Sequence, residues 1–191
     1  MNIPKLNHSG FLPPFLGEDS AKLGLNSPYK TSLIEVAKTF ATTEKRKEIF
    51  KGFLNYREAL KAIGITGGFQ WIDGSFIENC EIIRNKPPND IDIVTFFDTP
   101  SDIHAAEHII KSNEDLFDPI ICKQKYLCDA YVVYSPASRE YLINQIIYWY
   151  GIFSHQKVTY QWKGILQISL DSDDSEINNY LDSEVQNAEK T

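Results

Sequence analysis

The chain has 191 residues, of which 42% are hydrophobic and 13% are aromatic, so it can bury one sizeable core. With 24% charged residues, 10 glycines and 9 prolines, the composition excludes a disordered, collagen-like or repeat protein. The net charge is -7, but seven of the 26 acidic residues lie within residues 171–191 beside a single lysine. The acidity therefore describes the end of the chain more than its body.

Cysteine usage and hydropathy indicate the compartment. The three cysteines lack the paired C-x-x-C spacing of zinc or redox sites, so we interpret them as reduced thiols of a cytoplasmic protein. Uncharged apolar runs stay shorter than the roughly 18 residues that cross a bilayer, and the first residues lack the apolar core of a signal peptide. We expect no membrane partner.

The first third of the chain predicts an arm followed by two helices. Residues 1–28 contain four prolines and three glycines, which disfavour long helices and central strands, so we expect an extended proline-rich arm. Apolar side chains would hold this arm on the body: Phe11, Leu12, Phe15 and Leu16. Helical spacing of apolar residues predicts a helix over 31–40 and a second over 44–63, capped by Thr43 and ended by Gly64.

Strands and helices alternate in the remainder of the chain. β-rich runs predict strands over 69–72, 91–97 and 126–134, and a strand or hairpin over 158–170 with a turn at Lys163-Gly164. Residues 79–88 indicate a surface loop. Capping residues followed by proline predict a helix that opens at 99–102 and another that runs from Ser135 to Tyr150, where Gly151 ends it.

This alternation indicates an α/β (α+β) protein with a small mixed sheet and flanking helices. We expect one domain over residues 29–170, preceded by the arm over 1–28 and followed by an acidic tail over 171–191. The tail has few apolar residues, so we interpret it as solvated or as a loosely packed helix.

The most informative residues are two aspartates at the start of the second strand. In Asn89-Asp90-Ile91-Asp92-Ile93, side chains alternate between the faces of the sheet, so Asp90 and Asp92 point the same way with Cα atoms roughly 6 to 7 Å apart. Two carboxylates that close repel each other unless a cation lies between them. Mg²⁺ or Mn²⁺ is the cation that such oxygens bind together with substrate phosphates.

Two further features complete a possible site for phosphate chemistry. A two-metal centre needs a third carboxylate from a neighbouring strand, and Asp129 lies on such a strand. Gly74 and Ser75 follow the strand over 69–72, where a glycine turn lets the backbone approach a phosphate. The serine hydroxyl and the N-terminus of a following helix would donate hydrogen bonds to it. These residues together indicate a nucleoside triphosphate held over a metal-loaded acidic face.

This pattern resembles the DNA polymerase beta-like nucleotidyltransferase superfamily, especially its minimal prokaryotic members. The glycine-serine pair, the aspartate-hydrophobe-aspartate strand and the later single aspartate carry the resemblance over roughly residues 65–135. The segments 11–14 and 162–165 also look like a bacterial nucleotidyltransferase-like branch of it. The 14 residues between Ser75 and Asp90 are slightly more than is usual in the superfamily.

The resemblance implies an enzyme that moves a nucleoside monophosphate from an NTP to a hydroxyl of a protein, an RNA end such as that of tRNA, or a small molecule. Asp90, Asp92 and Asp129 would hold Mg²⁺ or Mn²⁺, and Asp129 would help to deprotonate the acceptor. Gly74 and Ser75 would contact the triphosphate. Kinship with minimal nucleotidyltransferases also implies a toxin-antitoxin or phage-defence setting.

Three alternatives stay open at this point. The first is a fold retained without turnover, in an antitoxin-like binding protein that meets a partner protein through its acidic tail. His104 and His108 match an inverted zinc-protease pattern on a predicted helix, although no third ligand is evident. Lys163 is a candidate phosphate ligand, or else a hydrated lysine at a turn.

Overall fold

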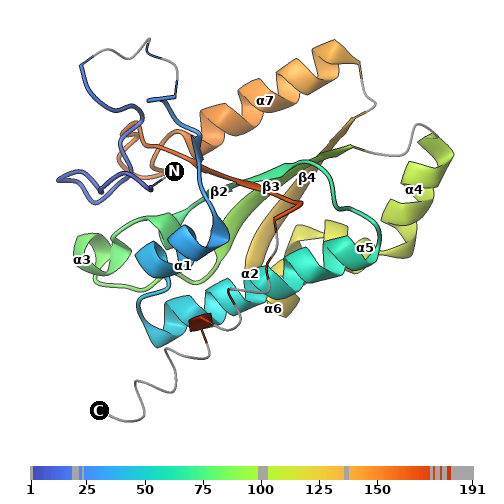
Figure 1. The fold of residues 1–191 in the computed structure, drawn as a ribbon, viewed down its shortest axis with the longest axis horizontal. Coiled ribbons are helices and arrows are strands. Elements are labelled where there is room, and N and C mark those ends of the chain that lie inside the picture. Colours follow the sequence, from blue (N-terminus) through green and yellow to red (C-terminus); the bar gives the residue numbers. More distant parts are fainter. Residues whose placement is uncertain are drawn as a thin grey trace.

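The computed structural model describes residues 2–18, 22, 24–98, 103–135, 138–172, 174, 177 and 180–181, without the side chains of residues 103–106 and 135. Five strands form one mixed sheet in the order β1-β5-β2-β3-β4 (Figure 1). They are β1 (Tyr29–Lys30), β2 (Phe69–Asp73), β3 (Ile91–Asp98), β4 (Cys128–Ser135) and β5 (Leu166–Ser169). β2 is antiparallel to β3 and β5, whereas β4 is parallel to β3 and β1 is parallel to β5.

Helices flank this sheet, which confirms the expected α+β class. They are α1 (Leu33–Phe40), α2 (Glu44–Ala62), the 3-10 helix η1 (Ser75–Ile77), α3 (Cys80–Arg84), α4 (Ile103–Ser112), α5 (Glu114–Phe117), α6 (Pro119–Tyr126) and α7 (Arg139–Phe153). Thr43 caps α2 as expected, because its hydroxyl accepts a hydrogen bond from the Arg46 backbone N–H. Among the described residues, none of the helices has both the length and the apolar character that a bilayer crossing requires.

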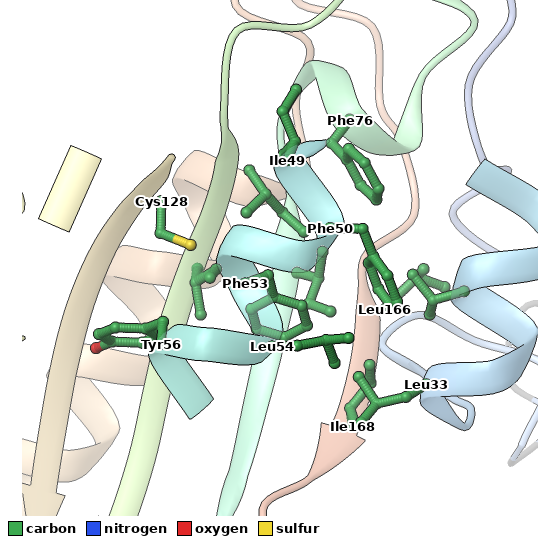
Figure 2. Packing of buried hydrophobic residues seen from close by; sticks show 14 of the residues in the cluster. Leu33, Ile49, Phe50, Phe53, Leu54, Tyr56, Phe76, Cys128, Leu166 and Ile168 are labelled. Atoms are coloured by element: carbon green, nitrogen blue, oxygen red, sulfur yellow. The ribbon is translucent and has the colours of Figure 1, made fainter. Parts of the chain in front are cut away.

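The larger core lies between one face of the sheet and helices α1, α2, α5 and α6. Figure 2 shows α2 packed in this core, with Tyr56 on the side of Cys128 of β4 and Phe50 on the side of Leu166 of β5 and Leu33 of α1. Ile91 and Ile93 of β3 point into this core and are fully buried. The neighbouring aspartates of β3 therefore face the opposite side of the sheet.

The smaller core lies on that opposite side, under α7 (Figure 1). Trp149 and Phe153 of α7 pack on Trp71, Val94 and other strand residues. The apolar side chains occupy the middle of this face, and the acidic residues lie at the end of the same face. Helix α7 packs on this face mainly through Trp149 and Phe153, and a cavity lies between that end of the helix and the aspartates.

The arm and the beginning of the tail both pack on the body. Phe11 and Leu12 are buried, as expected, and the Leu12 carbonyl accepts a hydrogen bond from the Gly164 N–H. At the other end, Ile177 and Leu181 belong to the larger core, and Asp174 forms ion pairs with Arg57 and Lys61. The start of the acidic segment is therefore not simply solvated, and residues 182–191 lie outside the described residues.

Several predicted elements differ from the observed ones. The expected loop over 79–88 contains α3, and the stretch before β4 contains α5 and α6. The prediction that Gly151 ends its helix is wrong, because α7 continues to Phe153 and ends where Ser154 donates its N–H to the Tyr150 carbonyl. The segment 158–170 forms a strand only over β5. The expected helix starts at 99–102 and at Pro136 lie outside the described residues.

Candidate functional site

Three aspartates form one row across three adjacent strands. Asp73, the last residue of β2, pairs with Asp92 of β3, and Asp92 in turn pairs with Asp129 of β4. Paired residues of neighbouring strands project from the same face, with the strands about 4.8 Å apart. Asp90 immediately precedes β3 and shares this face because it lies two residues before Asp92. The fold thus brings together the three aspartates that the sequence predicted and adds Asp73.

The acidic row borders an open cavity of about 850 Å³, a volume within the range of small-molecule sites. Asp73, Asp92 and Asp129 line it from the sheet, and Gly74 and Ser75 line it from the turn after β2. The opposite wall comes from the C-terminal end of α7 and from the segment 155–163 that follows it. The sequence predicted six residues for metal or nucleotide binding, and five of them border this one cavity: Gly74, Ser75, Asp92, Asp129 and Lys163. The sixth, Asp90, lies beside it.

Gly74 makes the tight turn between β2 and η1. Its φ of 79° and ψ of -167° lie in a region that only glycine adopts without strain. A Cβ atom at this position would lie 1.6 Å from Oδ2 of Asp92, so the turn also needs the absence of a side chain. The helix that follows, η1, has three residues, which corrects the expectation of a helix whose N-terminus would bind phosphate. The turn does bring the backbone of Gly74 close to the acidic row.

Lys163 lies in a buried cluster of charges. Its ammonium is 3.0 Å from Oδ2 of Asp73 and 2.8 Å from Oε1 of Glu78, and the lysine is only 3% exposed. Glu78 also pairs with Arg84 at 2.8 Å. The alternative of a hydrated lysine at a turn is therefore wrong. Any role of Lys163 towards a phosphate stays a prediction, because two carboxylates already engage its ammonium.

A second lysine, Lys123 of α6, lies beside Asp90 and Asp129, away from the Asp73 end of the row. Its ammonium contacts the carboxylate of Asp90 and lies 3.9 Å from Oδ2 of Asp129. The hydrogen bond to Asp90 raises the pKa of Lys123, with smaller contributions from the charges of Asp90 and Asp129. Unlike Lys163, Lys123 is half exposed, with 52% of its side chain accessible.

Asp92 occupies the middle of the row and has the least favourable surroundings for a negative charge. Burial, with smaller contributions from the carboxylates of Asp73, Asp90 and Asp129, raises its pKa to about 7. Burial also raises the pKa of Asp73 to about 6, against the opposing effect of the Lys163 ammonium. Oδ1 of Asp73 is buried without a hydrogen-bond partner. The two lysines therefore leave negative charge in the row uncompensated.

In the described part of the chain, no three His, Cys, Asp or Glu side chains are grouped closely enough to hold a metal ion as they stand. Lys123 and Lys163 lie against the carboxylates instead, so metal binding requires side-chain rearrangement. The zinc alternative gains no support: His108 is exposed beside Ser112, and the side chain of His104 lies outside the described residues.

Sequence reasoning missed the charged partners of the row. Asp73 had a usable signal, because it ends a predicted strand directly before Gly74-Ser75. Glu78, Lys123 and the carboxylate pairing of Lys163 had none, because they come from separate segments that meet only in the folded chain. Cys128, the neighbour of Asp129, points away from the site and is buried in the larger core.

Comparison with known proteins places the chain in a family. Residues 4–169 match the "Family of unknown function (DUF6932)". The chain belongs to this family. No curated protein and no solved structure matches it. The matched range of this DUF6932 protein contains the whole acidic row, the glycine turn and both lysines, so the candidate site lies within the part that defines the family.

Proposed function

We propose that this DUF6932 protein is a Mg²⁺-dependent nucleotidyltransferase that moves a nucleoside monophosphate from an NTP to a hydroxyl acceptor. The observation that carries the proposal is the row Asp73, Asp92 and Asp129, with Asp90 beside it, on the wall of a cavity that also contains Gly74 and Ser75. A protein, a tRNA end or a small molecule would supply the hydroxyl. We also propose a cytoplasmic location, which the three free and buried cysteines support.

The residues present fit a divalent cation. Burial and the neighbouring carboxylates raise the pKa of Asp92, and Asp73 has a buried oxygen without a partner. A cation among these oxygens would relieve both conditions. Asp90, Asp92 and Asp129 would hold it after rotation of their side chains. Bound there, Mg²⁺ would supply positive charge that stabilises the phosphate during transfer.

The side chains of the cavity can then divide the reaction among them. Asp129 is accessible from the cavity and would accept the proton of the acceptor hydroxyl. The hydroxyl oxygen forms a bond to the α-phosphorus, and the bond from that phosphorus to the pyrophosphate oxygen breaks, with the electron pair leaving on pyrophosphate. Ser75 would donate a hydrogen bond to the phosphates, and Gly74 keeps the wall beside Asp92 free of a side chain.

A second candidate is a binding protein that retains this fold without turnover, in a toxin-antitoxin or phage-defence setting. One observation favours it: Lys123 and Lys163 already pair with three of the carboxylates. Deleting the acidic tail would not be a clean test of a partner bound through it. Deletion would also remove Asp174, Ile177 and Leu181 from the packed body.

The deciding experiment is a transfer assay with each of the four α-³²P-labelled NTPs in the presence of Mg²⁺. Label is followed into the protein itself, into added tRNA and into small molecules. We expect transfer that falls by about 100-fold or more in Asp92→Ala, since that variant removes the central carboxylate. The matched control is Asp98→Asn, which changes an exposed aspartate at the far end of the same strand.

The outcomes separate the two candidates. Transfer that survives Asp92→Ala unchanged would refute the assignment of the site. NTP binding measured by calorimetry without any label transfer would favour the binding protein. Loss of transfer in Asp92→Ala but not in Asp98→Asn supports the enzyme.

A further inference from the structure

Lys123 lies where the proposed metal would be needed. Its ammonium contacts Asp90 and is 3.9 Å from Asp129, so one internal cation stands between two of the three carboxylates assigned to the metal. Asp90 immediately precedes β3 and Asp129 lies on the neighbouring parallel strand β4, so Lys123 reaches carboxylates from both segments. The lysine therefore already performs the electrostatic task that a divalent ion would perform.

The backbone that carries Lys123 is held firmly at both ends of α6. At the N-terminal end, the Asp118 carboxylate accepts hydrogen bonds from the N–H groups of Ile120 and Ile121. At the C-terminal end, Leu127 adopts a left-handed conformation with φ of 55°. Gly52 of α2 packs so closely there that a Cβ atom would lie 2.1 Å from the Tyr126 carbonyl oxygen. We therefore expect the side chain of Lys123, and not the backbone of α6, to move when a cation binds.

The two lysines of the site differ in their freedom to leave. Lys163 is 3% exposed and lies between Asp73 and Glu78, so its departure would leave Asp73 buried without a cation and Glu78 with Arg84 alone. Lys123 has 52% of its side chain exposed, so its ammonium can turn into water without becoming a buried unpaired charge. Asp90 and Asp129 would then lose the Lys123 ammonium, and an incoming cation would take its place.

We propose that Lys123 is an exchangeable counter-ion, which holds Asp90 and Asp129 together in the metal-free protein and is displaced when a divalent cation binds. This inference rests on the proposed function, because it assigns the same carboxylates to the metal. Lys123 is a positioning residue in this scheme, since it acts on the carboxylates and not on the substrate. The exchange keeps the acidic row assembled in both states.

Competition between Lys123 and the metal sets the expected size of the effect. A partly exposed ion pair contributes up to about 1 kcal/mol, which corresponds to about a fivefold change in a dissociation constant. Removing the ammonium should therefore tighten divalent-ion binding by about fivefold. Lys123→Arg keeps a positive charge at the same place and should leave the affinity close to that of the original protein.

The test measures Mn²⁺ binding to the full chain without nucleotide, by the loss of the free Mn²⁺ signal in electron paramagnetic resonance. The variants are Lys123→Met, Lys123→Arg, Asp92→Asn and the matched control Lys125→Met. Lys125 lies two residues away on the same helix, is also half exposed and pairs with Asp115 outside the acidic row. Unfolding in urea, measured without metal, reports whether each variant is folded.

We expect tighter Mn²⁺ binding in Lys123→Met alone and a loss of the site in Asp92→Asn. Equal affinities of Lys123→Met, Lys125→Met and the original protein would overturn the role of Lys123 and leave the metal site intact. Weaker binding in folded Lys123→Met would overturn it as well. If the original protein binds no Mn²⁺, or binds it equally well in Asp92→Asn, the result would count against the proposed function itself.

Discussion

At the scale of single residues, the position of Asp92 decides the electrostatics of the site. It has a carboxylate neighbour on each side in the sheet and a third, Asp90, two residues earlier and immediately before its strand. Among the described residues, no lysine or arginine forms an ion pair with it, whereas Asp73 and Asp90 each have one. Asp92 is thus the most crowded carboxylate of the row and has no ion-pair partner in the described part of the chain. A metal ion bound beside Asp92 would therefore gain the most from electrostatic attraction.

This crowding predicts how stability depends on pH in the metal-free protein. Because the pKa of Asp92 is about 7 in the folded state and about 3.9 in an unfolded chain, the folded state retains a proton that the unfolded state has lost. Stability should therefore fall as pH rises from about 4 to 7, by at most about 1.4 kcal/mol per pH unit for each such proton. Urea unfolding at several pH values measures this slope.

Asp92→Asn provides the comparison for that slope. The amide cannot ionise, so the variant should lose less stability than the original protein over the same pH window, and it should be the more stable of the two near pH 8. Identical slopes in the two proteins would show that Asp92 is not responsible. Added Mg²⁺ should flatten the slope of the original protein, since it stabilises the ionised form.

At the scale of elements, the site depends on how tightly the turn between β2 and η1 approaches β3. Gly74→Ala should displace the Asp92 carboxylate, because the added Cβ would lie 1.6 Å from Oδ2. We expect Mn²⁺ binding at least about tenfold weaker, measured as above, together with reduced stability. Gly64→Ala is the matched control: its φ is also positive, at 89°, but nothing lies within 4 Å of the added atom.

The control separates two explanations for any loss in Gly74→Ala. Strain alone should cost both variants about 1 to 2 kcal/mol of stability and leave metal binding of Gly64→Ala unchanged. If Gly74→Ala binds Mn²⁺ as well as Gly64→Ala does, the close contact with Asp92 has no functional meaning.

Elements with long periodic patterns were predictable, and short ones were not. The prediction for α2 agrees within one residue at its C-terminal end, because a broad apolar stripe and the Thr43 cap both mark it. Helix α6 was missed because its eight residues bury only Cys122 and Tyr126, with lysines between them. Its last residue was instead assigned to the following strand. Such a helix is stabilised by its contacts with α2 and β4, which local sequence does not reveal.

At the scale of the whole molecule, Arg57 joins the C-terminal segment to the centre of the fold. This fully buried guanidinium donates to Gln70 of β2, to the Ser169 carbonyl of β5 and to the Asp174 carboxylate. Asp174 also pairs with Lys61. Residues more than a hundred positions apart in the chain are thereby held around one buried positive charge.

Asp174→Asn should therefore destabilise the protein as a whole. Arg57 would keep its other partners but lose its carboxylate, so we expect a loss of about 1 to 3 kcal/mol in urea unfolding. Asp171→Asn, three residues earlier and exposed, should change stability by less than about 0.5 kcal/mol. Equal effects of the two variants would contradict the role of Asp174 as the partner of Arg57.

The α+β class, the main strands and the shared face of Asp90 and Asp92 could be predicted from the amino-acid pattern. These features follow from alternation along a strand and from helical periodicity, which are local properties of the chain. Folding was needed to bring Asp73 into the row, to bury Lys163 between Asp73 and Glu78, and to place Lys123 beside Asp90. The physical reason is that charge pairing depends on which distant segments the folded core brings together, and local pattern carries no information about that distance.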